Sequence, residues 1–252
     1  MPWSGASFHI ITSMTAAGSS SPAAPRRDAR TERWRAHREQ VRGEFVDAAF
    51  RALAEHGPDV SMDDIARAAG CAKPKLYRHF ADKTDLYLAI LERVQSTLWE
   101  RVLARISLTT DTLAHLLHTA IAEYVAVVEE QPDVFRFLVH SRMAQQAEQP
   151  ERAIEVAQRS ALLAAQLIEE RLAGQDVDTG SLELTAYAIF GAVGSATDWW
   201  LGANRARTEV MSTERFAEHV SIIAEGMLDG VARLNNLPID VDQPVHLAFR
   251  TE

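Results

Sequence analysis

The sequence contains a single cysteine, which excludes a disulfide within the chain and fits a reducing compartment. It also lacks an apolar run approaching the roughly 18 residues that a membrane-spanning helix requires. The N-terminal stretch MPWSGASFHIITSMTAAGSSSPAAP has no cationic segment, and its apolar run Phe8–Ile11 is too short for a signal peptide. We therefore expect a soluble cytoplasmic protein.

Positive charge is scarce overall, because 26 Lys and Arg residues oppose 35 Asp and Glu residues for a net charge of −9. Residues 24–95 carry 14 basic and 12 acidic side chains, whereas residues 96–252 carry 12 and 23. This balance argues against a non-specific coat on nucleic acid. It indicates two parts of the chain with different partners.

Sustained period-two alternation with β-branched residues, which is typical of strands, is missing. Apolar residues instead recur at three- and four-residue spacing from residue 34 onward, which predicts an all-α protein. A long helix is expected to begin at Lys83, capped by Asp82. Further helices are expected at roughly 110–131, 133–148, 150–173, 181–203 and 212–235.

The stretch SMDDIARAAGCAKPKLYRHFADK, which begins at Ser61, predicts two short helices around a glycine. Ser61, with an aspartate three positions later, resembles a capping box. Gly70 allows the left-handed backbone of a sharp turn. Leu76 and Phe80, four positions apart, bury one side of the second helix. Such a unit is a helix-turn-helix when its second helix enters a DNA major groove.

The positive charge of this stretch is concentrated after the glycine. Lys and Arg neutralise phosphates and donate to guanine acceptors, whereas Tyr and His bond phosphate oxygens. The free N–H groups beside Lys83, at the start of the next helix, also suit a phosphate. The side chains expected to project outward are Lys73, Lys75, Tyr77, Arg78 and His79.

The string MDDIARAAGCAKPKLYRHFADKTDLY resembles the DNA-binding region of TetR-family one-component transcriptional regulators, with their glycine turn, Leu-Tyr-x-His-Phe and following Lys. The resemblance covers about residues 38–92, and the remainder matches only in its helical plan. The residues that it implies against base edges are Lys73, Pro74 and Lys75. Those that it implies on phosphates are Tyr77, His79 and Lys83, with Arg78 in either role.

The resemblance also implies an N-terminal three-helix helix-turn-helix DNA-binding domain followed by a C-terminal helical ligand-binding and dimerisation domain. We expect a sequence-specific repressor that a small-molecule ligand releases from its double-stranded operator, without a cofactor. The expected segments are a disordered tail at 1–30, the DNA-binding domain at 31–82, the helical domain at 83–237 and a C-terminal tail at 238–252.

Two positions depart from the family pattern. Position 72 is often Ser or Thr, which caps the recognition helix and touches a phosphate, but here it is Ala72. Pro58 replaces the aromatic residue that often follows the glycine at position 57.

Upstream, six arginines between Arg26 and Arg38 are open to two interpretations. They are either the solvated first turns of a helix or a basic arm that reaches a phosphate backbone or a minor groove.

The last two predicted helices carry a candidate dimer seam, because apolar residues four and three apart keep one face toward a partner helix. Packing inside one subunit is the alternative. By resemblance to the family we expect a homodimer. The expected interface residues are Gly191, Gly194, Phe216, Val220, Ile223, Met227 and Leu234.

A ligand pocket is expected in the helical domain, where aromatic and polar residues recur, although core packing is an alternative for each residue. The acidic domain favours a lipophilic or cationic effector. Asp198 beside two tryptophans can hold a cation, cap a turn or pair with Arg205. The candidate pocket residues are Tyr124, Phe135, His140, Met143, Tyr187, Phe190, Asp198 and Trp199.

Catalytic and metal-binding motifs do not stand out. His115 and His118 lack the third close ligand of helical zinc sites, so no metal is expected. Cys71 is interpreted as a small core residue rather than a redox sensor. The chain is not expected to be an enzyme. The alternative is a helical small-molecule-binding or enzymatic bundle whose helix-turn-helix is vestigial.

Overall fold

The computed structural model describes residues 29–107, 109–140, 159, 161–163, 165–166, 179–206, 211–234, 240–244 and 247–248. Within these ranges the regular structure is α-helical, apart from one isolated bridge between Thr112 and Pro244. The predicted all-α fold class is confirmed.

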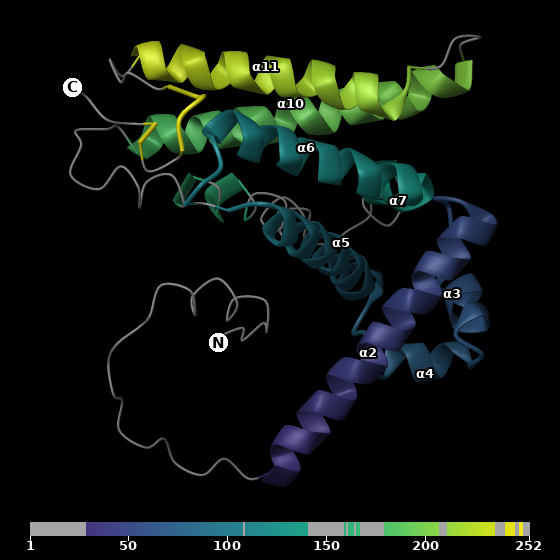
Figure 1. Ribbon diagram of the computed structural model, residues 1–252. Helices are drawn as coiled ribbons and strands as arrows, with labels where there is room; N and C mark the ends of the chain where they lie inside the picture. The colour runs from purple at the N-terminus through teal and green to yellow at the C-terminus, as the bar shows by residue number, and fades with distance from the viewer. Residues whose placement is uncertain are drawn as a thin grey trace. The chain divides into compact units, whose positions relative to one another are not determined.

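The described helices follow one another in the order that the sequence predicts (Figure 1). Their bounds are α2 Ala29–His56, α3 Met62–Ala68, α4 Lys73–Tyr77, α5 Lys83–Arg105, α6 Leu113–Glu130, α7 Pro132–His140, α10 Thr179–Ala206 and α11 Thr213–Leu234. The predicted helix at 150–173 and the end of the one at 133–148 lie largely outside the described residues.

Local sequence sets where several helices begin and end. Gly57 takes a left-handed conformation (φ +78°) directly after α2, and its N–H donates to the carbonyl of Leu53 at 2.8 Å. Pro132 is the first residue of α7, where its missing N–H leaves no bond unmade. Thr112 caps α6, since its hydroxyl accepts the N–H of His115 at 3.1 Å.

The helices before residue 83 enclose a small apolar core. The rings of Phe45 in α2 and Phe80 after α4 meet edge to face, with centroids 6.1 Å apart. The fully buried side chains around them come from α2, α3 and α4. They include Leu53, Ile65 and Leu76. This core holds the buried side of α4 in place.

A larger core lies between α6, α10 and α11. Trp200 of α10 stacks on Phe216 of α11, with centroids 4.8 Å apart and planes at 8°. The Trp200 indole N–H donates to the carbonyl of Met211 at 2.9 Å. Other buried members are Ile121, Val125, Val128, Leu201, Ala217, Val220 and Ala224.

The long helix α5 is tied to α2 and α7. The Arg93 guanidinium pairs with the carboxylate of Asp47 in α2 at 2.6 Å. The Tyr87 hydroxyl donates to the carbonyl of Leu138 in α7 at 2.7 Å, and burial raises the pKa of Tyr87 to about 12. Through these contacts α5 connects the helices before residue 83 with those that follow it.

Two Arg–Glu pairs join α5 to α6. Arg101 donates to both carboxylate oxygens of Glu130, at 2.7 and 2.6 Å. The Arg105 guanidinium lies 2.8 Å from the Glu123 carboxylate, and Glu123 is only 5% exposed. A carboxylate this buried requires a charged partner, so the Arg105–Glu123 pair fixes the end of α5 against α6.

The C-terminal segment packs against the start of α6. The Ala114 N–H donates to the carbonyl of Val241 at 3.0 Å. Ala248 is buried beside Leu113. The described part of the predicted tail at 238–252 is therefore held in place by backbone hydrogen bonds and apolar contacts.

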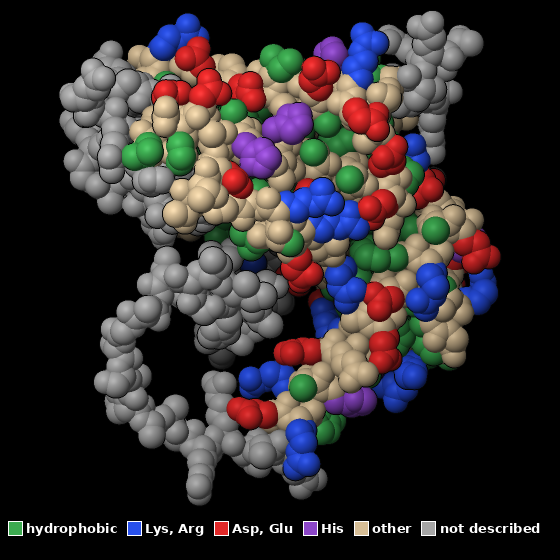
Figure 2. All heavy atoms as spheres, viewed as in Figure 1, with side chains coloured by type: hydrophobic (Ala, Val, Ile, Leu, Met, Phe, Trp, Pro, Cys, Tyr) green, Lys and Arg blue, Asp and Glu red, His purple; other side chains and the backbone are tan. Residues whose placement is uncertain are grey.

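Acidic side chains gather over α11 on the face seen in Figure 2, in line with the acidic surplus of residues 96–252. Among the residues that the structure describes, no helix is both long and apolar enough to cross a membrane. The predicted division of the chain at residues 82 and 83 stays a prediction.

Candidate nucleic-acid interface

The first helix of the predicted helix-turn-helix, α3, starts with the predicted capping box. The Ser61 hydroxyl accepts the Asp64 N–H at 3.2 Å, and the Asp64 carboxylate accepts the Ser61 N–H at 3.0 Å. Hydrogen bonds from the Ser61 hydroxyl and N–H lower the pKa of Asp64 to about 2. Ile65 is fully buried and orients α3 on the core. Local sequence therefore fixes both the start and the buried face of α3.

A tight turn joins α3 to α4. Gly70 has the predicted left-handed backbone, with φ +64°, a conformation that residues with a Cβ rarely adopt. The Cys71 N–H donates to the carbonyl of Ala66 at 2.9 Å. Arg51 of α2 donates to the carbonyl of Ala68 at 3.3 Å, which holds the end of α3 to α2. The turn is thus fixed by one backbone hydrogen bond and one hydrogen bond from the Arg51 side chain.

The structure gathers the predicted DNA-contacting residues around α4. Leu76 and Phe80 are fully buried, which turns the rest of α4 outward. Exposed side chains here are those of Lys73, Pro74, Lys75, Tyr77, Arg78 and Lys83. The seventh, His79, is half-buried, and its ring tilts against Phe45 at a centroid distance of 5.3 Å.

Lys83 follows these residues in the sequence and is the first residue of α5. The Asp82 carboxylate accepts the Asp85 N–H at 2.7 Å, as expected of a cap. The Asp85 carboxylate in turn accepts the Ala81 N–H at 3.0 Å. These two bonds fix the connection between α4 and α5. They hold the Lys83 backbone at the first turn of a 23-residue helix.

Helix α4 begins without a side-chain cap. Ala72 takes the N-cap position with φ −80° and ψ 143°, the extended backbone that a capping serine uses, but makes no side-chain hydrogen bond. Ala72→Ser is expected to stabilise α4 by about 0.5–2 kcal/mol. Slower amide exchange in α4 and tighter operator binding would measure the gain. Ala72→Val, which adds bulk without an acceptor, is the control and should give neither.

The upstream arginines lie on the first turns of α2, in the part that the structure describes from residue 29. Arg35, Arg38 and Trp34 are exposed, the last at 71%. Arg26 and Arg27 lie outside the described residues. Both interpretations of this segment, a solvated helix and a DNA-contacting arm, stay open.

Four of the predicted pocket residues form two pairs that join α6, α7 and α10. The rings of Tyr124 and Phe135 meet edge to face at 6.4 Å, and burial raises the pKa of Tyr124, which also bonds Thr197. The His140 imidazole lies 2.5 Å from the Asp198 carboxylate and links α7 to α10. Asp198 therefore pairs with a histidine, whereas the side chain of Arg205, one of the alternative partners, lies outside the described residues.

The other predicted pocket residues of α10 are more exposed. Trp199 and Phe190 are 49% and 40% exposed, and Tyr187 is half-buried. Helical geometry turns Trp199 by about 200° from Thr197, two residues earlier. Trp199 therefore lies on a different side of α10 from Thr197, which is fully buried. Met143 lies outside the described residues.

Two residues of the predicted dimer seam are buried in the single chain. Phe216 and Val220 are 2% and 4% exposed, because they pack against α6 and α10 of their own subunit. Both belong to the core of the single chain, and Val220 also lines the groove described below, so the seam itself stays a prediction. Ile223 and Leu234, by contrast, are 55% and 81% exposed, Met227 and Gly194 are half-buried, and Gly191 is exposed.

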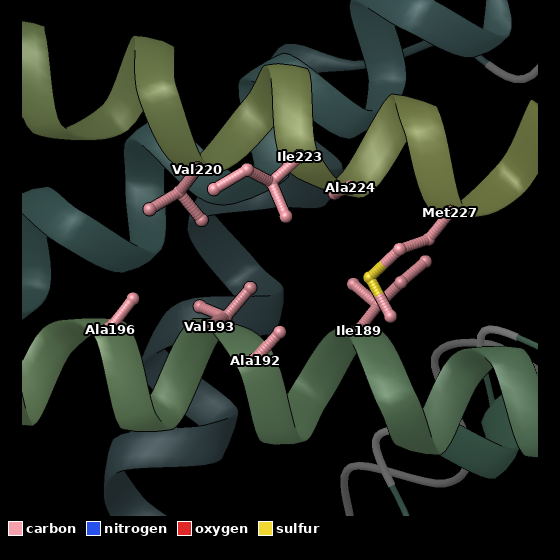
Figure 3. Close-up of a pocket in the computed structure, with 8 residues that line it drawn as sticks. All are labelled: Ile189, Ala192, Val193, Ala196, Val220, Ile223, Ala224 and Met227. Atoms are coloured by element: carbon pink, nitrogen blue, oxygen red, sulfur yellow. The ribbon is translucent and has the colours of Figure 1, made fainter.

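A shallow apolar groove runs between α10 and α11 (Figure 3). Side chains from the two helices point toward one another across it. All eight of its residues are apolar: Ile189, Ala192, Val193, Ala196, Val220, Ile223, Ala224 and Met227. The exposed Leu184 of α10 and Ile222 of α11 add apolar surface that the sequence pattern did not single out.

The histidines His115 and His118 line a polar cleft with Arg105 and Glu123. The described residues include no group of three or more His, Cys, Asp and Glu side chains arranged for a metal. The cleft instead contains the Arg105–Glu123 ion pair, so its chemistry is that of a helix–helix contact.

Two family models match the chain. Residues 45–90 match the model of bacterial regulatory proteins of the tetR family, and residues 104–231 match the tetracyclin repressor-like C-terminal domain. An uncharacterised HTH-type transcriptional regulator of Mycobacterium tuberculosis, Rv0472c, is 33% identical over 208 residues. These residues cover 81% of this chain and 84% of that protein.

Solved structures share the fold. A TetR-family transcriptional regulator from Streptomyces coelicolor gives a TM-score of 0.60 at 21% identity, over 79% of this chain and 84% of that one. The regulator FadR from Bacillus subtilis, solved with stearoyl-CoA, gives 0.55 at 17% identity, over 72% and 96%. At these identities the likeness concerns the fold alone.

A helix-turn-helix with outward cations, joined to a helical domain, defines a DNA-binding transcriptional regulator. The matching models and the full-length relative agree with that class. The chain belongs to the TetR family of transcriptional regulators.

Proposed function

We propose that this regulator reads its operator with the surface formed by Lys73, Pro74, Lys75, Tyr77, Arg78, His79 and Lys83. The observation that carries the proposal is the exposure of six of these side chains around α4, whose Leu76 and Phe80 are fully buried. A helix that packs on a buried core and carries hydrogen-bond donors on its exposed side suits major-groove contacts. The half-buried His79 has the least freedom to reach a phosphate.

Substitutions separate the two kinds of DNA contact. Lys83→Ala removes a proposed phosphate contact, so it should weaken binding to all DNA and lower the salt slope by about one phosphate per subunit. Lys75→Ala removes a proposed base contact and should relax preference at one position of each half-site. Titrations of both variants on operator and random duplexes measure this. Equal effects of both on the two duplexes would contradict the division of roles.

We propose that two copies of the chain pair through α10 and α11. A second copy is the occupant that fits, because the exposed Leu184, Trp199, Ile223 and Leu234 and the apolar groove all lie on these two helices. Reading two half-sites with one small helix each also requires a dimer. Dimers are typical of the family.

We propose that a small molecule binds near α6, α7 and α10 and releases the operator. Support comes from the Tyr124–Thr197 and His140–Asp198 contacts, which place polar groups beside aromatic rings in this region. A lipophilic or cationic effector stays the expectation. Ligand and DNA would favour different conformations of the same chain, so each would lower the affinity for the other.

The test is a fluorescence-anisotropy titration with DNA from upstream of the gene, at two salt concentrations and against random competitor. Competitor-resistant binding with two subunits per site supports the proposal. Stearoyl-CoA, the ligand of a fold neighbour, and tetraphenylphosphonium, a lipophilic cation, are suitable first probes for release. Weak binding that competitor abolishes leaves two interpretations, an operator elsewhere or a helical binding protein or enzyme with a vestigial helix-turn-helix. Repression and a cytoplasmic location stay predictions.

A further inference from the structure

One cation of the proposed DNA surface is paired with a carboxylate of the same chain. The Lys73 ammonium lies 2.7 Å from a carboxylate oxygen of Asp63, ten residues earlier. The pair joins the start of α4 to the first turn of α3, and both side chains are solvent-accessible, at 43% and 58%. The hydrogen bond from Lys73 to Asp63 raises the pKa of Lys73, so the ammonium stays charged.

The pairing singles out Lys73 within this surface. For Lys75 and Lys83, no ion pair is found within the described ranges of the chain. The neighbouring carboxylate, Asp64, is occupied by Ser61 and by Arg67, whose guanidinium lies at 2.9 Å. Asp63 is therefore the acidic side chain of the α3 first turn that faces Lys73.

The pair has opposite consequences for random and specific DNA. Random DNA attracts the protein through its phosphates, and a lysine that keeps its carboxylate partner contributes little to that attraction. A base acceptor at a matching operator position offers Lys73 a directed hydrogen bond in exchange for the one to Asp63. The carboxylate thus penalises phosphate contacts by Lys73 more than base contacts.

We propose that Asp63 is a positioning residue for specificity, which holds Lys73 away from phosphates until a matching base is in place. The proposal rests on the DNA-reading surface described above. It assigns to an acidic residue of α3 the task of weakening non-specific binding.

The test compares the full chain with its Asp63→Asn variant on random and operator duplexes over a range of salt. Asp63→Asn should strengthen binding to random DNA by about three- to tenfold at low salt. Its salt slope should steepen by about 0.9 per subunit, the value for one added phosphate contact. Operator affinity should change less, so that the ratio of specific to random affinity falls.

Three variants make the test decisive. Asp59→Asn removes an exposed negative charge of the same domain, has no ion pair among the described residues, and should leave the ratio unchanged. Asp63→Glu keeps the charge and should restore the ratio. In a Lys73→Ala background Asp63→Asn should have no further effect, because the two residues act as one unit.

The proposal is overturned if Asp63→Asn matches Asp59→Asn, or if its effect persists without Lys73. Circular dichroism and thermal melting establish that each variant is folded. The random-DNA titrations need no operator, so they test Asp63 even where the wild-type chain shows no operator preference. That latter result would count against the proposed function alone.

Discussion

Ile223→Glu is expected to convert the proposed dimer to a monomer and to lower operator affinity by about 100-fold or more. The side chain is 55% exposed in the single chain and lines the apolar groove between α10 and α11. A carboxylate there would be buried without a partner in the dimer, whereas the lone subunit would leave it in water. Linking two DNA-reading modules raises avidity by roughly 10²–10⁴, and that gain would be lost.

The matched control is Ile222→Glu on the same helix. Ile222 is 61% exposed, but its neighbours one turn away include Glu218 and Glu225, so it lies among polar side chains. Sedimentation velocity and anisotropy with operator DNA should show a dimer that binds for Ile222→Glu and a monomer that binds weakly for Ile223→Glu. A dimeric Ile223→Glu variant would place the subunit contact elsewhere.

Trp200→Ala is expected to cost about 3–5 kcal/mol of unfolding free energy, which is the range for removing a large buried aromatic side chain. Trp200 is 4% exposed, stacks on Phe216 and donates its N–H to the Met211 carbonyl. The substitution leaves a cavity between α10 and α11 and removes the hydrogen bond to the Met211 carbonyl. Differential scanning calorimetry should record a fall in melting temperature of roughly 10 °C.

Two further variants separate the contributions to that loss of unfolding free energy. Trp200→Phe keeps a ring to stack on Phe216 but has no N–H donor, and should cost less than half as much. Trp34→Ala removes an indole that is 71% exposed and should change the unfolding free energy by no more than about 0.5 kcal/mol. A loss for Trp200→Ala as small as that for Trp34→Ala would contradict the assignment of Trp200 to the core.

Local signals in the sequence predicted the helix-turn-helix well. The Ser61 cap, the left-handed Gly70, the uncapped Ala72 and the Asp82 cap all occur as predicted, because each depends on contacts within about four residues. The buried pair Leu76 and Phe80 follows from helical spacing alone.

Features that depend on distant contacts were less predictable. Phe216 and Ile223 fit the same heptad-like seam, yet only packing against α6 and α10 decides that Phe216 is internal and Ile223 is not. The Asp63–Lys73 pair spans ten residues and depends on the angle between α3 and α4. The docked residues 240–244 and 247–248 are held largely by backbone hydrogen bonds, which helical periodicity does not predict.

The length of α5 has a mechanical consequence. Its 23 residues span about 34 Å, so a tilt of roughly 5° about the Arg105 end would carry Lys83 through about 3 Å. That displacement is as long as a hydrogen bond, whereas contacts to base edges tolerate far less. An angular change too small to disturb the Arg105–Glu123 pair at one end of α5 would therefore suffice to move the proposed reading surface, at the other end, out of register with its DNA.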